Sequence, residues 1–208
     1  MPKKKEQKYN IIKCFNLHGD EVELDYCDYV QFALVGQHAL EENAHMLISK
    51  SDVEIVMEFL WYLGKDGYPV TYTSIDKKIK FGKGYKIHRF LEQETPPGMV
   101  VDHINRNKLD NRRENLRVCT IAENSYNKTK VKTVSIDDET GKKPRKIKSK
   151  YKGVRKDNKN EWSASITKDG KKYEMKNLPD EITAAKMYDL MSEELFGQFC
   201  AKNNPVSQ

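Results

Sequence analysis

The stretch that decides the fold is VVDHINRNKLDNRRENLRVCTIAEN, which runs from Val100 to Asn124. Two short apolar segments, Val100-Val101 and Leu116 to Cys119, enclose a run that is too polar and too rich in asparagine for regular structure. The segment from Thr120 to Glu123 has the T-x-x-E spacing of a capping box, so a helix is expected to start there. The pattern therefore predicts a strand, a long polar loop, a second strand and a helix.

This order of elements can bring Asp102, His103 and Asn124 together, because Asp102 ends the first strand and Asn124 lies in the first turn of the helix. A carboxylate and an amide oxygen suit a hard cation such as Mg²⁺, with water and phosphate oxygens in the remaining positions. A neutral histidine beside them could take a proton from water, as a hydrolytic reaction requires. The competing interpretation is a surface loop that happens to contain one histidine, and the ordered spacing favours a nuclease.

Arginines around this stretch offer cations for a phosphate backbone. They are Arg89, Arg106, Arg112, Arg113 and Arg117.

Four segments carry a resemblance to a known family. They are His88-Arg89-Phe90, Val100 to Asn105, Asp110 to Arg117, and Glu123-Asn124. In this order they resemble the HNH homing endonucleases, more narrowly the phage and intron type without zinc-binding cysteines, over about residues 52 to 128. The resemblance implies the ββα-metal fold for this part of the chain.

The resemblance also implies roles for individual residues. His103 would be the general base, and Asp102 and Asn124 would be the metal ligands. Asn115, the middle letter of the motif, would hydrogen-bond across the loop and hold His103 in position. His88 would have a supporting or phosphate-facing role, and the alternative is a residue at a helix start with no part in the chemistry.

The rest of the chain divides by composition. Residues 1–50 mix short apolar runs with charged turns and are expected to form a small irregular region of unassigned role; residues 51–128 form the nuclease part. Within it, Ser51 to Glu54 has capping-box spacing ahead of a helix, and Val70 to Thr73 with Lys78 to Phe81 is expected to form a hairpin. Residues 129–150 are rich in lysine with glycine and proline and read as a basic linker, with a solvated surface as the alternative.

Residues 151–204 read as a small separate domain. Tyr151 to Lys156, Glu161 to Thr167 and Lys171 to Lys176 are expected strands, and Asp169-Gly170 is a tight turn between the last two. Pro179 then precedes a helix with apolar residues on one face. Three antiparallel strands packed on one helix follow from this pattern.

The same segment is similar to the Apetala-type DNA-binding domain of plant ethylene-response factors. The matching residues are Tyr151 to Arg155, Trp162 to Ile166, Ala184-Ala185, Tyr188-Asp189 and Asn203. In that family the sheet lies in the major groove and the helix packs behind it. The resemblance implies a set of DNA-facing residues, namely Lys152, Gly153, Arg155, Ser165, Thr167 and Lys172. Several arginines of the plant domain are replaced here and a strand-three tryptophan is Glu174, so the plant target sequence does not transfer.

The chain of 208 residues carries a formal net charge of +6, which agrees with a polyanionic partner but is weak evidence alone. No apolar stretch is long enough to span a membrane, and the charged N-terminus is not a secretory signal. The four cysteines lie far apart without a CxxC pair, which favours reduced thiols over disulfides or a structural zinc site.

Together these observations predict an α+β protein: a ββα-metal nuclease module, a linker, and a three-stranded sheet on one helix. The predicted function is site-specific hydrolysis of DNA phosphodiester bonds by a homing-type endonuclease with one divalent metal, Mg²⁺ or alternatively Mn²⁺. The expected partner is double-stranded DNA, in the cytoplasm of a bacterial or phage-infected cell. The sequence does not fix the oligomeric state and is compatible with a monomer. One alternative is a non-catalytic, sequence-specific DNA-binding regulator; another is an RNA-binding protein, although no ribonucleoprotein-type motif is present.

Overall fold

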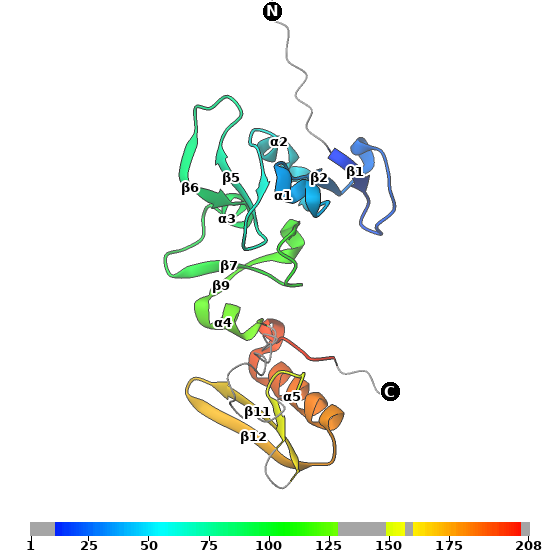
Figure 1. The fold of residues 1–208 in the computed structure, drawn as a ribbon, viewed down its shortest axis with the longest axis vertical. Helices are drawn as coiled ribbons and strands as arrows, with labels where there is room; N and C mark the ends of the chain where they lie inside the picture. Colours follow the sequence, from blue (N-terminus) through cyan, green and yellow to red (C-terminus); the bar gives the residue numbers. More distant parts are fainter. Residues whose placement is uncertain (1–10, 129–148, 157–159, 205–208) are drawn as a thin grey trace, which may run out of the picture. The chain divides into compact units, whose positions relative to one another are not determined.

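The structure is a computed structural model that describes residues 11–128, 149–156 and 160–204 (Figure 1). These residues belong to two compact units, which divide after Ile121. Most of the expected linker, residues 129–148, lies outside the described residues. In the part of the chain that is described, no helix has the length and apolar character needed to cross a membrane.

The elements of the first unit are short. Its strands are β1 (Ile11–Phe15), β2 (Tyr29–Ala33), β3 (His45–Ser49), β4 (Tyr62–Leu63), β5 (Pro69–Thr73), β6 (Lys80–Lys86), β7 (Met99–His103), β8 (Asp110–Asn111) and β9 (Leu116–Thr120). Its helices are α1 (Gln37–Glu41), α2 (Val53–Val56) and α3 (Ile87–Leu91), with the 3-10 turns η1 (Leu24–Tyr26), η2 (Lys50–Asp52) and η3 (Arg113–Asn115). Helix α4 (Ile121–Tyr126) crosses the point where the two units divide.

The N-terminal sheet corrects the expectation of an irregular region before residue 50. Its strands lie in the order β1-β2-β3-β8, antiparallel except for the parallel pair β3–β8. Along β2 and β3 every second side chain is buried, including Val30, Phe32, Met46 and Ile48. This is the alternation of a sheet with one face on a core. Each strand is only five residues long, so the alternation was too brief to stand out in the sequence.

The second sheet, β4-β5-β6, contains the predicted hairpin of β5 and β6 and leads directly into α3. The helix expected after Ser51 is shorter than predicted: α2 has four residues, and its first residue is preceded by a 3-10 turn. The carboxylate of Asp52 does not cap the helix and instead accepts hydrogen bonds from Arg113 Nε and Nη2, both at 2.8 Å.

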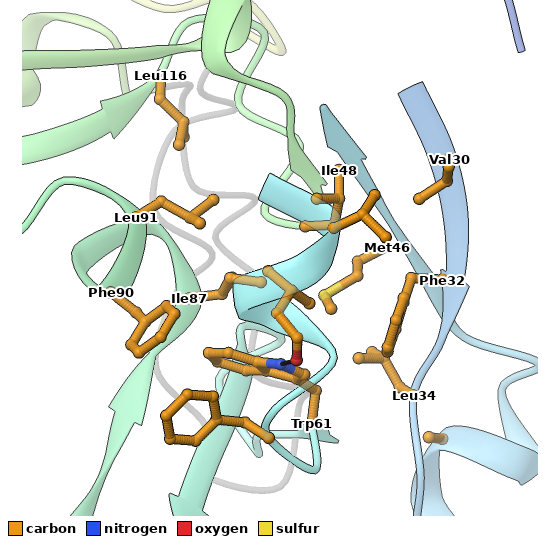
Figure 2. Packing of buried hydrophobic residues seen from close by; sticks show 14 of the residues in the cluster. Val30, Phe32, Leu34, Met46, Ile48, Trp61, Ile87, Phe90, Leu91 and Leu116 are labelled. Atoms are coloured by element: carbon orange, nitrogen blue, oxygen red, sulfur yellow. Dashed lines mark hydrogen bonds between the residues drawn. The ribbon is translucent and has the colours of Figure 1, made fainter. Parts of the chain in front are cut away.

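The predicted strands on either side of the polar loop are confirmed as β7 and β9, which pair antiparallel, and the predicted helix follows as α4. A single apolar core joins this pair to the two sheets (Figure 2). In Figure 2, Leu116 of β9 and Leu91 of α3 lie on one side of the cluster, opposite Val30 and Phe32 of β2. Trp61 lies between them, 1% exposed, and its Nε1 donates to the Val56 carbonyl oxygen at 2.9 Å.

The second unit has the architecture predicted for it. Its elements are β10 (Val154–Lys156), β11 (Trp162–Lys168), β12 (Lys171–Leu178), α5 (Glu181–Phe196) and the 3-10 turn η5 (Gly197–Phe199). The three strands form one antiparallel sheet in chain order, and α5 packs against it through Ala184, Ala185 and Tyr188. Asp180 caps the helix, since its Oδ1 accepts the Thr183 N–H at 2.7 Å. The α+β fold class is thus confirmed.

Candidate active site

The β7–β9 pair places the central residues of the motif at one end of a short ladder. Asp102 faces Arg117 across the two strands, and His103 faces Leu116. Val101 on β7 and Leu116 on β9 are buried in the apolar core, so the core holds this end of the strand pair in place. Asp102 and His103 are themselves buried, 8% and 4% exposed, at the point where the chain leaves β7 for the polar loop.

The His103 ring is held by three neighbouring side chains. Its Nε2 lies 3.0 Å from Asn111 Oδ1, in a buried hydrogen bond. The ring of His88 meets it edge-on with centroids 5.1 Å apart, and Tyr68 is tilted over both histidines at 4.8 and 5.9 Å. Burial lowers the pKa of His103 below its ordinary value, while the bond to Asn111 and the Asp102 carboxylate act in the opposite direction. The result is an oriented imidazole that favours its neutral form.

His88, which was predicted to have a supporting or phosphate-facing role, is deeply buried. It is the second residue of α3 and 5% exposed, and its Nδ1 is buried without a hydrogen-bond partner among the described residues. Burial, with a smaller contribution from His103, lowers the pKa of His88 to about 3. His88 is therefore a neutral, aromatic neighbour of His103 at ordinary pH.

The polar loop is closed by Asn115, which uses both ends of its amide. Its Oδ1 accepts the Asn105 N–H at 2.9 Å, and its Nδ2 donates to Asn105 Oδ1 at 2.9 Å and to the Asp110 carbonyl oxygen at 2.7 Å. Asp110 in turn accepts two hydrogen bonds from the Arg112 guanidinium, both at 2.8 Å, and one from Asn105 Nδ2 at 2.7 Å. Burial acts to raise the pKa of Asp110, but the bonds from Arg112 prevail and lower it.

Asp102 is paired with an arginine on the facing strand. Arg117 Nε and Nη2 both donate to Asp102 Oδ2, at 3.1 and 2.7 Å, and the two side chains are only 11% and 9% exposed. The pairing follows from the register, because the two residues are directly opposite. A carboxylate held in this way presents its oxygens in a fixed direction.

The second predicted metal ligand, Asn124, lies on α4 in the part of the chain that belongs to the second unit. It is partly buried. The carboxylate of Asp102 and the amide oxygen of Asn124 are both hard donors of the kind that Mg²⁺ and Mn²⁺ prefer. Among the described residues no three His, Cys, Asp or Glu side chains come together as a metal-binding group.

The arginines predicted to meet DNA divide into two groups. Arg89 on α3 and Arg106 in the loop are exposed. The other three are engaged with carboxylates: Arg112 with Asp110, Arg113 with Asp52 and Glu92, and Arg117 with Asp102. Arg89 and Arg106 are therefore the two that have no carboxylate partner among the described residues, whereas Arg112 holds the loop residue Asp110 and Arg117 holds Asp102 across the strand pair.

Comparison with known proteins indicates the family of the chain. Residues 93–126 match the model of a family described as HNH endonuclease. The chain is also 38% identical over 179 residues to an uncharacterized HNH endonuclease of Acanthamoeba polyphaga mimivirus, an alignment that covers 84% of this chain and 81% of the relative. The chain belongs to the HNH endonucleases. No solved structure matches this HNH endonuclease significantly.

Two residues of the site were not assigned roles from the sequence. Asn111 was part of the Asp110 to Arg117 segment that carried the resemblance, but nothing in the sequence indicated that its side chain reaches His103. Tyr68 precedes Pro69 and reads as a turn residue, yet its ring covers both histidines of this endonuclease. Only the folded chain shows these contacts.

The second unit has a candidate interface on the sheet face that points away from α5. Ala164 and Ile166 of β11 face the helix, so the alternating residues Ser165 and Thr167 face outward. On the neighbouring strands, Lys172 is paired with Thr167, and Arg155 bonds to Ser163 and Glu174. Four predicted DNA contacts, Arg155, Ser165, Thr167 and Lys172, therefore share one face.

The other two predicted contacts are used within the unit. Lys152 Nζ donates to the carbonyl oxygens of Tyr126 and Lys128, at 2.9 and 2.6 Å. Gly153 has φ +69°, and a Cβ at this position would come 2.1 Å from the Tyr188 ring. Lys152 is thus hydrogen-bonded within the unit, and Gly153 lies where a side chain would not fit.

Proposed function

We propose that this chain is a site-specific, homing-type DNA endonuclease that hydrolyses phosphodiester bonds of double-stranded DNA with His103 as the general base. The observation that supports this most is the position of the His103 ring, buried at the end of β7 beside Asp102 and fixed by three side chains. A general base must be oriented toward one proton, and a ring held on several sides meets that requirement.

The chemistry asks two things of His103. It must be neutral to accept a proton, and burial favours the neutral form. It must also lie where a water molecule and a phosphate can approach, and residues 104–108, which follow it directly, are exposed. The water that gives its proton to His103 attacks phosphorus. The bond from phosphorus to the leaving sugar oxygen breaks and that oxygen takes up a proton from solvent, which yields a phosphate monoester and a hydroxyl end.

Asp102 and Asn124 would hold one divalent cation, Mg²⁺ or Mn²⁺, through their oxygens. When bound, such an ion offsets negative charge at the scissile phosphate and the leaving oxygen. Arg117 orients the Asp102 carboxylate from the facing strand. Asn115 keeps the loop closed around Asn105 and Asp110, and so keeps His103 in place.

DNA would be held by both units. Arg89 and Arg106, both exposed, are the proposed phosphate contacts near the cleavage site. The second unit is proposed to act as an Apetala-type domain, which its three-stranded sheet with a helix on one face supports. Its outward face would read DNA through Arg155, Ser165, Thr167 and Lys172. Lys152 and Gly153 would act indirectly, by shaping the unit.

The test uses the full chain, supercoiled plasmid and a mixed DNA library, with Mg²⁺ or with EDTA. His103→Ala should lower the cleavage rate by about 10²- to 10⁴-fold, the contribution of a general base, while DNA binding in a mobility-shift assay is retained. Arg155→Ala should weaken DNA binding. His18→Ala, an exposed histidine of the first unit, is the control and should cut like the parent. If His103→Ala also cuts like the parent, the assignment of the base is wrong.

The rival function is a DNA-binding regulator without catalysis. It predicts retarded but intact DNA for the parent across many targets and with either metal. Metal-dependent nicking that EDTA stops would exclude it.

A further inference from the structure

Asn111 is a wholly buried residue that touches His103. Its side chain is 0% exposed, which is unusual for an asparagine in a loop this polar. The amide makes two hydrogen bonds: Oδ1 lies 3.0 Å from His103 Nε2, and Nδ2 lies 3.2 Å from the carbonyl oxygen of Lys108. A buried amide with both ends satisfied has one orientation only.

The Lys108 contact decides which atom carries each proton. A backbone carbonyl can only accept a hydrogen bond, so the amide must turn its NH₂ toward Lys108. Its oxygen then faces His103, and since that oxygen also only accepts, Nε2 of His103 must carry a hydrogen. A neutral imidazole has one N–H, so the basic lone pair is on Nδ1.

The backbone of Asn111 is fixed from far along the chain. It lies on β8 and pairs with Ile48 of β3, while Asp110 pairs with Leu47. The Leu47 N–H donates to the Leu109 carbonyl oxygen at 2.8 Å. Ile48 is 0% exposed in the core of the unit, so β3 is a rigid support. The N-terminal sheet therefore holds the backbone of Asn111 in place beside His103.

We propose that Asn111 is a positioning residue: held by β3 and by the Lys108 carbonyl, it fixes His103 as the Nε2–H tautomer and directs Nδ1 toward the water to be deprotonated. The inference rests on the proposed role of His103 as the general base. It adds that the side-chain amide of Asn111 determines which ring nitrogen of His103 carries the hydrogen. Removal of the amide oxygen frees the ring to adopt the other tautomer or to rotate, in which case the lone pair points into the protein.

The first test reads the tautomer directly and does not depend on cleavage. In ¹⁵N-labelled full-length protein without metal, long-range proton–nitrogen spectra at neutral pH distinguish a protonated ring nitrogen from one with a lone pair. His103→Ala assigns the signals. The parent should show Nε2–H, and Asn111→Leu should show a mixture or Nδ1–H. A parent with Nδ1–H, or an Asn111→Leu spectrum identical to the parent, would overturn the inference.

The second test separates positioning from folding. Asn111→Leu should lower kcat by roughly 10- to 100-fold, as loss of a partner that orients a histidine does, with little change in KM for DNA. Asn111→Asp keeps an acceptor oxygen and should recover both the tautomer and part of kcat. Thr71→Val is the control: it removes a buried hydroxyl of the same unit, bonded to the Thr73 carbonyl oxygen, and should alter neither.

The outcomes are distinguishable from failure of the proposed function. If His103→Ala cuts normally, His103 is not the base, but the spectra still report whether Asn111 sets its tautomer. If Asn111→Asp and Asn111→Leu lose activity equally while both keep Nε2–H, Asn111 does not act through the tautomer and the inference fails.

Discussion

In the segment between β7 and β9 the buried side chains are polar, whereas the core cluster of the second unit is built from alanine, valine, isoleucine, tyrosine and phenylalanine, with a few buried polar residues such as Ser163 and Ser192 beside it. Asp110, Asn111 and Asn115 are at most 6% exposed, and every one of them is hydrogen-bonded. The second unit instead brings a helix close to a sheet through small residues such as Ala184 and Ala185. Buried polar groups specify one geometry but tolerate few substitutions, because each group needs its hydrogen-bond partner. An apolar core depends on fit, and it fails where volume is added.

The largest effect on stability is expected where the second unit has no spare volume. Gly153→Ala would place a Cβ 2.1 Å from the Tyr188 ring and 2.6 Å from the Ser165 carbonyl oxygen, at a positive φ. Overpacking and strain together should cost about 2 to 4 kcal/mol of unfolding free energy. Urea denaturation measures it, with Gly170→Ala as the control: that glycine also has a positive φ but has no atom within 4 Å of the added Cβ. Equal losses at the two glycines would show that packing on Tyr188 is not the constraint.

A smaller but chemically specific loss is expected in the polar loop. Asn115→Asp keeps the shape but cannot donate to Asn105 Oδ1 and to the Asp110 carbonyl oxygen. Leaving buried partners unsatisfied should lower the free energy of unfolding by about 1 to 3 kcal/mol.

In the second unit, Ile166→Val changes the volume of a core side chain without changing its polarity, and it should lower the free energy of unfolding by about 0.5 to 1.5 kcal/mol. Thermal unfolding measures the two losses, and native-state hydrogen exchange assigns each loss to its unit. A larger loss from Ile166→Val than from Asn115→Asp would show that the buried polar loop is not the less tolerant region.

The first unit should also be the acid-sensitive one. Unfolded His88 binds a proton below its ordinary pKa of 6.5, whereas folded His88 resists protonation down to about 3. Stability from this residue is therefore full above pH 6.5 and is lost as the pH falls toward 3, by about 2 kcal/mol between pH 7 and pH 5. His88→Phe should reduce this dependence, and His18→Gln on the surface should leave it unchanged. The measurement is urea denaturation at both pH values; an unaltered slope in His88→Phe would contradict it.

The smallest expected effect concerns the outward face of the second unit. Glu174 accepts hydrogen bonds from Arg155 and Lys172, and these bonds, led by that from Lys172, lower the pKa of Glu174 to about 2. Glu174→Gln would release both cations toward DNA and should tighten binding severalfold, with a steeper dependence on salt. Glu194→Gln, an exposed residue of α5, makes the same change in net charge and is the control. Equal tightening by the two variants would point to net charge and not to this face.

The sequence predicted those parts of the fold in which each segment carries its own signal. The apolar runs of β7 and β9, the capping box of α4, and the turn between β11 and β12 lie within a few residues of the elements they define. The pairing of β3 with β8 could not be predicted, because a strand of two residues has no periodicity and its partner is far away in the sequence. The same limit applies to the site. His103 and Asp102 could be proposed as site residues from their neighbours in the sequence and the family resemblance. The contacts of Asn111 with His103, and of Arg117 with Asp102, depend on strand register and could not be predicted.

The parallel pair β3–β8 also bears on the order in which the molecule is made. Strand β3 leaves the ribosome long before Asp110 and Asn111 are synthesised, so one of its edges stays open during that interval. The loop cannot take its final shape until that edge is filled, and closing so long a segment of chain is a slow step compared with forming a local hairpin. A nascent chain could thus pair β1, β2 and β3 before the β3–β8 pair brings Asn111 against His103.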